Sequence, residues 1–285
     1  MAATTDDASV VLAEHDSSES GKEETKKARA KSRSKSGEAP GVESKSTSKT
    51  GSRTSSKTDL EADKARLKKL LSFDREMTGK WVKKEGAILL GTDEVGRGCL
   101  AGPVVAAAVH LSDIEADSDL AALLTSLDDS KKMTAPKRED LSEVLKSRCR
   151  FAIAESSVEE IDQMNILQAS LLAMKRALAE LGPPPGTVIL IDGNKTINEV
   201  RFRQIAVIGG DAISASIAAA SVLAKVYRDR LMKDLHEQFP AYRWDSNKGY
   251  GSKDHRDAIQ EHGLTSWHRK SFCAKLQVEQ LSLLS

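Results

Sequence analysis

Four acidic residues stand beside glycines at the ends of short apolar runs, where a carboxylate can face a cleft instead of open solvent. Asp93 and Glu94 precede a Gly-rich turn, Asp192 directly follows a Val/Ile/Leu run, and Asp211 follows two glycines. Each acid taken singly is explained as a loop or helix-start residue, where the helix dipole contributes only about 0.3–1 kcal/mol. Together, four carboxylates on neighbouring strand ends repel unless a hard divalent cation neutralises them, and oxygen ligands suit Mg²⁺ or Mn²⁺. We therefore predict a metal site built from these four residues.

Asp93 and Glu94 pose a geometric problem, because consecutive side chains on a regular strand point to opposite faces of the sheet. They can share one site only if the strand ends or bends there. Glycines at positions 96 and 98 allow such a bend, and the longer glutamate side chain can reach around it. We therefore expect the strand to end or bend at the two acids.

The elements that must position these acids alternate between strands and helices. Apolar runs at 87–90 and 103–111 flank the Gly-rich turn and predict a β-hairpin with a buried face. The continuous run 187–191 predicts a strand that is buried on both sides. Further strands are expected at 151–156 and 201–208. Residues 129–139 indicate a turn and the start of a helix that runs to about Lys146, and further helices are expected over 157–181 and over 214–239. This order indicates an α/β layered domain of about 200 residues.

The first 58 residues differ in composition from the rest of the chain, since Ser, Thr, Lys, Glu, Gly and Ala dominate and the first aromatic residue is Phe73. Such a segment cannot bury enough apolar surface to offset its chain entropy, so we expect residues 1–58 to be disordered. Residues 22–57 carry 11 Lys or Arg against 4 acidic residues, a net charge of +7. This basic stretch either adds non-specific phosphate contacts or is simply solvated. A helical segment is expected over 59–83, with Asp59 as its N-cap, and a folded domain over 84–285.

The overall composition is that of an ordinary soluble protein: among 285 residues, 39% are hydrophobic and 30% are charged. A net charge of +1 excludes a strongly basic nucleic-acid binder, so any polyanion must be held by local patches. Cys99, Cys149 and Cys273 form no Cys-x-x-Cys pair, which favours a reducing compartment. No apolar run reaches membrane-spanning length and no secretory signal opens the chain. We predict a cytoplasmic protein that does not bind membranes.

Six ordered blocks of the sequence resemble the type 2 ribonuclease H family, bacterial ribonuclease HII. They are Gly91-Thr92-Asp93-Glu94-Val95-Gly96-Arg97-Gly98 with the run 101–109, Asp129-Ser130-Lys131-Lys132, residues 161–169, Ile191-Asp192-Gly193-Asn194, residues 211–230, and Asn247-Lys248-Gly249-Tyr250-Gly251. The similarity covers roughly residues 60–273. One departure is Cys99, because the family usually has proline after the Gly-Arg-Gly motif, and we expect only a small change in loop stiffness.

The resemblance implies an RNase H-like fold, a central mixed sheet flanked by helices, with a helical C-terminal part. It also implies an endoribonuclease that cuts the RNA strand of RNA/DNA hybrids and cuts 5′ to ribonucleotides embedded in duplex DNA. By the resemblance, Asp93, Glu94, Asp192 and Asp211 are catalytic and hold two divalent ions, Mn²⁺ or Mg²⁺, about 4 Å apart. The products carry 5′-phosphate and 3′-hydroxyl ends. We expect the enzyme to act as a monomer.

The resemblance also assigns residues that bind the nucleic acid. Gly96, Arg97 and Gly98 are implied to sense the ribose 2′-hydroxyl, since backbone without Cβ can approach the minor groove closely. Tyr250 is implied to pack near the junction between ribonucleotide and deoxyribonucleotide. Lys131, Lys132 and Lys225 are candidates for phosphate contact.

Each of these binding assignments has a simpler structural alternative. The Gly-Arg-Gly motif can be a plain tight turn, the tyrosine a core residue with a satisfied hydroxyl, and the lysines surface groups. His255, His262 and His268 are spaced unlike a zinc site, and we expect them to be helix-end or surface groups, with His268-Arg269-Lys270 placed to touch phosphates.

Two other classes of protein compete with this hypothesis. A non-catalytic nucleic-acid binding module would use the Gly-Arg-Gly loop and the basic tail to hold a duplex. The four strand-end carboxylates argue against it, because a protein that only grips phosphates would place negative charge elsewhere. Another nuclease or integrase of the same fold would share the carboxylates but lack the Asp-Glu-Val-Gly-Arg-Gly loop.

Overall fold

The computed structural model describes residues 9–12, 57–111, 124–125, 133–274 and 276. Most of the predicted disordered tail, residues 1–58, therefore lies outside the described residues, as do Lys131 and Lys132. Within the described ranges, no helix combines the length and the hydropathy needed to cross a bilayer.

A six-stranded mixed sheet forms the centre of the molecule. In spatial order its strands are β1 (Ser9–Leu12), β6 (Arg203–Val207), β5 (Val188–Asp192), β2 (Leu89–Val95), β3 (Val104–His110) and β4 (Arg150–Ser156). The first four run parallel, whereas β3 and β4 are antiparallel to their neighbours. The predicted hairpin is formed by β2 and β3, and the predicted strands at 151–156, 187–191 and 201–208 are β4, β5 and β6. β1 was not predicted, because it lies within residues 1–58, whose composition indicated disorder.

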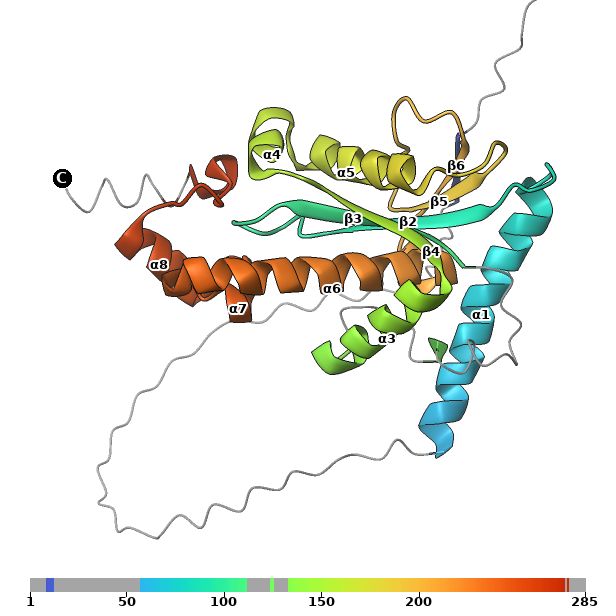
Figure 1. The fold of residues 1–285 in the computed structure, drawn as a ribbon, viewed down its shortest axis with the longest axis horizontal. Coiled ribbons are helices and arrows are strands. Elements are labelled where there is room, and N and C mark those ends of the chain that lie inside the picture. The colour runs from blue at the N-terminus through green and yellow to red at the C-terminus, as the bar shows by residue number, and fades with distance from the viewer. Residues whose placement is uncertain (1–8, 13–56, 112–123, 126–132, 275, 277–285) are drawn as a thin grey trace, which may run out of the picture.

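Helices cover both faces of the sheet (Figure 1), as the alternation of strands and helices predicts. On one face lie α4 (Val158–Met164) and α5 (Ile166–Leu181), and on the other lie α1 (Lys57–Trp81), α3 (Ala135–Arg148) and the long helix α6 (Ala215–Gln238). Three apolar clusters separate these layers. One lies between β3 and helices α1, α3 and α6, a second between the sheet and α5, and a third between the parallel strands β2, β5 and β6 and helices α1 and α6. The core therefore has one apolar layer on each face of the sheet.

The long helix α6 packs unusually close to the central strand β2. A Cβ atom on Gly91 would lie 2.2 Å from the carbonyl carbon of Ser216, so only glycine permits this approach. Alanines at 106–108 of β3 and at 218–220 of α6 are fully buried and keep the layers thin. The close packing brings the first turns of α6 next to β2, the strand that carries Asp93.

The helix predicted over 157–181 is interrupted, and that prediction was wrong at one residue. Ser157 starts α4 with a capping box, in which its hydroxyl accepts from the backbone N–H of Glu160 and the Glu160 carboxylate accepts from the Ser157 N–H. Asn165 then adopts φ 75° and ends α4, while its side-chain oxygen accepts from the backbone N–H groups of Leu167 and Gln168 and starts α5. One asparagine therefore serves as the C-cap of one helix and the N-cap of the next.

Helix α1 begins at Lys57, two residues before the predicted N-cap Asp59, and is joined to α6 by a buried carboxylate. Asp74 accepts hydrogen bonds from the Ser214 hydroxyl at 2.5 Å and from the backbone N–H and hydroxyl of Ser216 at 2.8 and 2.7 Å. Burial raises the pKa of Asp74, and these hydrogen bonds oppose that shift. The contact fixes α1 against the start of α6.

The C-terminal part is helical, as predicted, and packs around an aromatic cluster. It contains α7 (Trp244–Asn247), α8 (Lys253–His262) and a short helical stretch at 270–274. Trp244 is completely buried and stacks on Tyr242, with ring centroids 5.2 Å apart. This cluster supports the loop around residues 247–251, which faces the Gly-Arg-Gly motif through a bridge between Cys99 and Tyr250.

Candidate active site

Asp93 and Asp192 lie side by side because of the register of the parallel strands β2 and β5. The last paired positions are Thr92 and Ile191, and each acid is the next residue on its own strand. Residues that are paired across parallel strands project from the same face, so the two carboxylates point the same way. The sheet topology alone therefore brings together two acids that are 99 positions apart in the sequence.

Asp93 is a buried carboxylate with negative neighbours. Burial, followed by the charges of Asp192 and Glu94, raises its pKa well above the ordinary value for aspartate. A hydrogen bond from Ser221 of α6 and one from the Glu94 backbone N–H, at 2.7 Å to Oδ1, oppose the shift only in part. The group thus sits where a cation would stabilise its charged form.

Glu94 reaches the same cleft from the next position on β2. Its carboxylate is 8% exposed and accepts a hydrogen bond from Nη1 of Arg97 at 2.9 Å. Burial raises the pKa of Glu94, Arg97 lowers it, and Asp192 raises it further. The expectation that the strand ends or bends at the two acids was wrong, because β2 continues to Val95 and stops at Gly96, whose φ is +94°. Both acids reach the cleft because β2 extends past the end of β5.

The fourth predicted acid, Asp211, comes from a different element than the other three, which lie on β2 and β5. It lies in a single 3₁₀ turn, Gly210–Ala212, between β6 and α6. Its neighbour Gly210 donates a backbone hydrogen bond of 2.7 Å to Oδ1 of Asp192, so the turn is attached to the end of β5. The side chain of Asp211 is not among the residues that line the cleft.

A cleft of about 560 Å³ opens above the end of β5. It is lined by Asp93, Glu94, Val95, Gly96, Arg97, Gly98, Arg138, Asp192, Ser221, Lys225 and Tyr250. Within the described part of the chain, no group of three His, Cys, Asp or Glu side chains is already arranged as a metal site. The donors nevertheless fit a hard divalent cation, because three mutually repelling carboxylates share one cleft and offer only oxygen ligands.

The Gly-Arg-Gly loop and Tyr250 form the opposite wall of the cleft. Gly98 and Arg97 are exposed, whereas Gly96 is buried directly over the side chain of Arg228. Tyr250 is 44% exposed, and its ring lies 5.9 Å from Nζ of Lys225. Tyr250 is therefore not a core residue.

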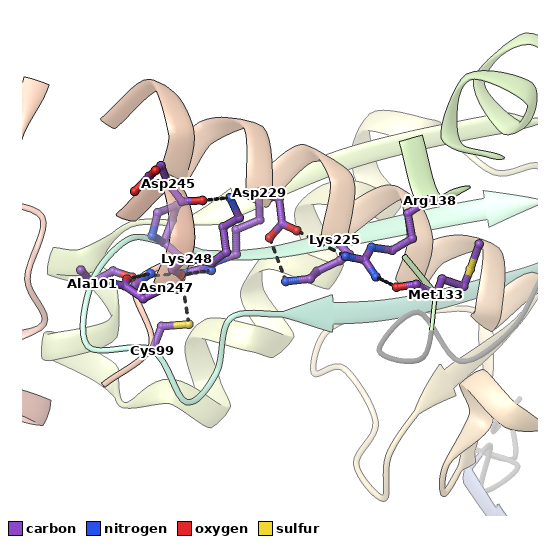
Figure 2. A network of polar contacts seen from close by, with 12 residues as sticks. Cys99, Ala101, Met133, Arg138, Lys225, Asp229, Asp245, Asn247 and Lys248 are labelled. Atoms are coloured by element: carbon purple, nitrogen blue, oxygen red, sulfur yellow. Dashed lines mark hydrogen bonds and ion pairs between the residues drawn. The ribbon is translucent and has the colours of Figure 1, made fainter. Parts of the chain in front are cut away.

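Cys99, which departs from the family pattern, is fully buried under the loop. Its thiol lies 3.7 Å from the carbonyl oxygen of Lys248 (Figure 2), so the side chain joins the Gly-Arg-Gly loop to the segment that carries Tyr250. Packing and this weak hydrogen bond hold the Cys99 side chain in place.

Cationic side chains gather along α6 beside the cleft. Lys225 donates to Asp229 at 2.8 Å, and Arg138 of α3 approaches the other Asp229 oxygen at 3.9 Å, so one carboxylate holds both cations (Figure 2). Arg138 was not predicted as a site residue, because a Lys-Arg pair in the first turns of a helix is typical of a solvated face. Its position becomes evident only when α3 packs against α6.

The expectation for the C-terminal histidines was wrong for two of the three. His255, His268 and the adjacent Arg269 are buried, with exposures of 0%, 1% and 0%, and only His262 lies on the surface. The two buried rings contact each other, with 3.1 Å between their Nε2 atoms. Arg269 therefore cannot touch a phosphate directly.

A mixed sheet flanked by helices, with acids at the ends of its two central parallel strands, is the architecture of the RNase H-like nucleases. The model of the ribonuclease HII family matches residues 90–277. The chain belongs to the ribonuclease HII family, the metal-dependent endonucleases that hydrolyse RNA in RNA/DNA hybrids and cut at ribonucleotides embedded in duplex DNA.

Individual relatives agree with this assignment. The chain is 45% identical over 205 residues to the ribonuclease HII of Sphingopyxis alaskensis, a match that spans 72% of this chain and 98% of that protein. It is 53% identical over 184 residues to the ribonuclease HII of Ruegeria pomeroyi, covering 65% and 75% of the two chains.

Solved structures give the same result for the fold. The ribonuclease HII of Archaeoglobus fulgidus, solved in complex with PCNA, superposes with a TM-score of 0.54 at 28% identity, covering 64% of this chain and 93% of that one. The ribonuclease H2 of Pyrococcus horikoshii superposes with a TM-score of 0.56 at 24% identity, covering 68% and 98%, and supports the fold alone. The predicted family and fold are thus confirmed.

Proposed function

We propose that Asp93, Glu94, Asp192 and Asp211 form the catalytic and metal-binding site of this ribonuclease HII. The observation that carries the proposal is the convergence of the first three carboxylates in one cleft, where burial and mutual repulsion raise the pKa of Asp93 and Glu94. Asp211 stands on the turn attached to Asp192, at the border of this group. The site requires positive charge, and its ligand oxygens suit two divalent ions, Mn²⁺ or Mg²⁺.

Two bound cations would supply activation of the attacking water and stabilisation of the charge that develops on the phosphate and the leaving 3′ oxygen. The protein itself contributes position and a shielded environment. The Ser221 hydroxyl and the Glu94 N–H hold the Asp93 carboxylate, the Gly210 N–H holds that of Asp192, and Arg97 holds that of Glu94. These partners hold the acids on the strands of the central sheet, next to one another in the cleft, where bound cations would complete the ligand geometry.

The Gly-Arg-Gly loop is proposed to recognise the ribonucleotide. Gly98 is exposed on the cleft wall, and no atom lies within 4 Å of the position that a Cβ would take, so a ribose can approach its backbone. Tyr250 offers an exposed ring beside the same wall, suited to stacking on a sugar or base at the junction. Both features support recognition of a ribonucleotide at this wall. As the resemblance implies, we propose a cut on its 5′ side that leaves 5′-phosphate and 3′-hydroxyl ends.

Phosphate contacts are proposed for Lys225, with Arg138 beside it, because Asp229 holds both cations at the cleft wall. Lys131 and Lys132 remain candidates by resemblance only. We further propose that the enzyme acts as a monomer, as the resemblance implies. The three cysteines are free thiols, in keeping with the cytoplasm.

The decisive experiment uses duplex DNA that contains a single ribonucleotide, with Mn²⁺ or Mg²⁺. We expect cleavage 5′ to the ribonucleotide that stops on addition of EDTA. Asp93→Asn should slow it at least about 100-fold, since the metal-mediated stabilisation it disturbs is worth several kcal/mol. The matched control is Asp257→Asn, an exposed carboxylate on α8, which should cleave at the wild-type rate. Tight binding without cleavage by the wild type would instead indicate a binding module.

A further inference from the structure

Arg269 is a fully buried arginine whose side chain is directed at the Gly-Arg-Gly loop. Its Nη1 donates to the carbonyl oxygen of Arg97 at 2.9 Å, and its Nε and Nη2 donate to that of Gly102 at 2.9 and 2.8 Å. All three nitrogens thus donate to backbone carbonyls at the two ends of one loop. Neither the family assignment nor the catalytic chemistry accounts for this arrangement.

The contact to Arg97 determines which way one peptide group faces. In a trans peptide the C=O and the following N–H point in opposite directions. Because the Arg97 carbonyl points inward to the buried Arg269, the N–H of Gly98 points outward. That N–H has no hydrogen-bond acceptor among the described residues, and Gly98 lies exposed on the cleft wall.

Arginine is suited to this position because its planar fork presents three nitrogens in fixed directions to two carbonyls, whereas the three donors of an ammonium group all radiate from one nitrogen. The guanidinium also lies 5.3 Å from the ring centroid of Phe272. The backbone just after it is fixed by Asp162, whose carboxylate accepts from the N–H groups of Lys270 and Ser271 at 2.9 and 3.0 Å. Burial lowers the pKa of Arg269 to about 10, which still leaves it charged at neutral pH.

We propose that Arg269 is a positioning residue for ribonucleotide recognition: it fixes the Arg97–Gly98 peptide so that the Gly98 N–H faces the ribose 2′ oxygen. The inference rests on the proposed function, since it deepens the role assigned to the Gly-Arg-Gly loop. Arg228, the other buried arginine beneath this loop, contacts the carbonyls of Ala101, Pro103 and Lys248 and leaves the Arg97 carbonyl to Arg269.

The test measures binding in an Asp93→Asn background, which separates recognition from cleavage. Two DNA duplexes are compared that differ in one ribonucleotide, and the readout is the ratio of their dissociation constants. We expect Arg269→Gln to reduce the preference for the ribonucleotide about fivefold, the equivalent of one neutral hydrogen bond. Any general loss of duplex affinity should change both dissociation constants by the same factor, so it cancels in their ratio.

Two further variants make the result decisive. Arg269→Lys keeps the charge but not the planar fork, so it should also lose at least about half of the preference for the ribonucleotide. If circular dichroism shows that Arg269→Gln does not fold, the result for Arg269→Lys decides the question. Arg230→Gln removes an arginine 47% exposed on α6 and should leave the ratio unchanged. An unchanged ratio in both Arg269 variants would overturn the inference. Absence of any preference in the parent protein would instead count against the proposed role of the Gly-Arg-Gly loop.

Discussion

Gly96 and Gly98 belong to the same loop, but their surroundings differ. Gly96 has φ +94°, and a Cβ there would lie 2.3 Å from Nε of the buried Arg228. Gly98 has open space where its Cβ would be. The first glycine is therefore required by the fold, whereas the second leaves room for a ligand.

Alanine substitutions should separate these two roles. Gly96→Ala is expected to lower the free energy of unfolding by about 1–3 kcal/mol from the backbone conformation alone, with the Arg228 clash added to it. Gly98→Ala should leave the free energy of unfolding unchanged but lower kcat/KM about 10- to 100-fold on a duplex with one ribonucleotide, because the methyl group displaces the ribose. Urea titration and steady-state cleavage measure the two effects, and equal stability of both variants would contradict this view.

At the residue scale, the types of the acids could be predicted from the sequence but their geometry could not. Asp93, Glu94 and Asp192 were identified because each lies near glycine at the end of an apolar run. That Asp93 stands beside Asp192 depends on the β2–β5 register, which periodicity does not encode. Arg269 was expected on the surface, and Arg138 was not recognised as a site residue. The reason is that a solvated cation and one enclosed by the fold have the same local sequence pattern.

At the scale of elements, strongly apolar runs were predicted well and capping details were not. β5 and β3 are continuous buried runs, so their existence follows directly from composition. The break between α4 and α5 depends on a single asparagine at φ 75° inside a stretch with helical periodicity on both sides. α5 packs on β3 and β4, and this tertiary packing stabilises the interrupted helix pair. No local sequence pattern indicates the interruption.

The C-terminal elements are joined by a chain of hydrogen bonds through two neutral histidines. The Thr265 backbone N–H donates to Nδ1 of His268, which leaves the proton of that ring on Nε2, facing His255. Trp244 also donates to Nε2 of His255, whose Nδ1 lies 2.9 Å from the Tyr250 carbonyl oxygen. The chain thus connects α7, α8 and the 270–274 helix to the loop that carries Tyr250, and it requires both rings to be uncharged.

This requirement predicts a pH dependence of stability. Burial, with the neighbouring His255, lowers the pKa of His268 to about 4, against about 6.5 in an unfolded chain. Because the folded-state pKa is depressed, the stabilisation is complete above pH 6.5 and is lost as pH falls toward 4, by about 1.4 kcal/mol per pH unit. Urea titrations at pH 7, 6 and 5 should show a smaller pH dependence for His268→Asn than for the wild type. His262→Asn, a surface control, should follow the wild type.

At the scale of the whole molecule, the basic segment of the N-terminal region is bounded by two structured elements. It follows β1, which pairs with β6, and precedes α1. Leu12 is in register with Val207, and Val207 with Asp192. Because β1, β6, β5 and β2 are parallel, the chain leaves β1 at the edge of the sheet where Asp93 and Asp192, two of the proposed catalytic carboxylates, stand. The sequence alone did not indicate this proximity, since β1 was not predicted.

The position of this edge predicts that the basic segment adds phosphate contacts next to the proposed active site. The densest cationic run holds Lys26, Lys27, Arg29, Lys31, Arg33 and Lys35. Replacing these six residues with glutamine keeps the chain length and should make the plot of log K against log salt less steep, by about 0.9 for each phosphate that is no longer neutralised. The fall in affinity should be equal for a duplex with one ribonucleotide and for all-DNA duplex, because phosphate contacts do not report the 2′-hydroxyl. An unchanged slope would show that these charges remain in solvent, whereas a larger fall for the ribonucleotide duplex would place the segment in recognition itself.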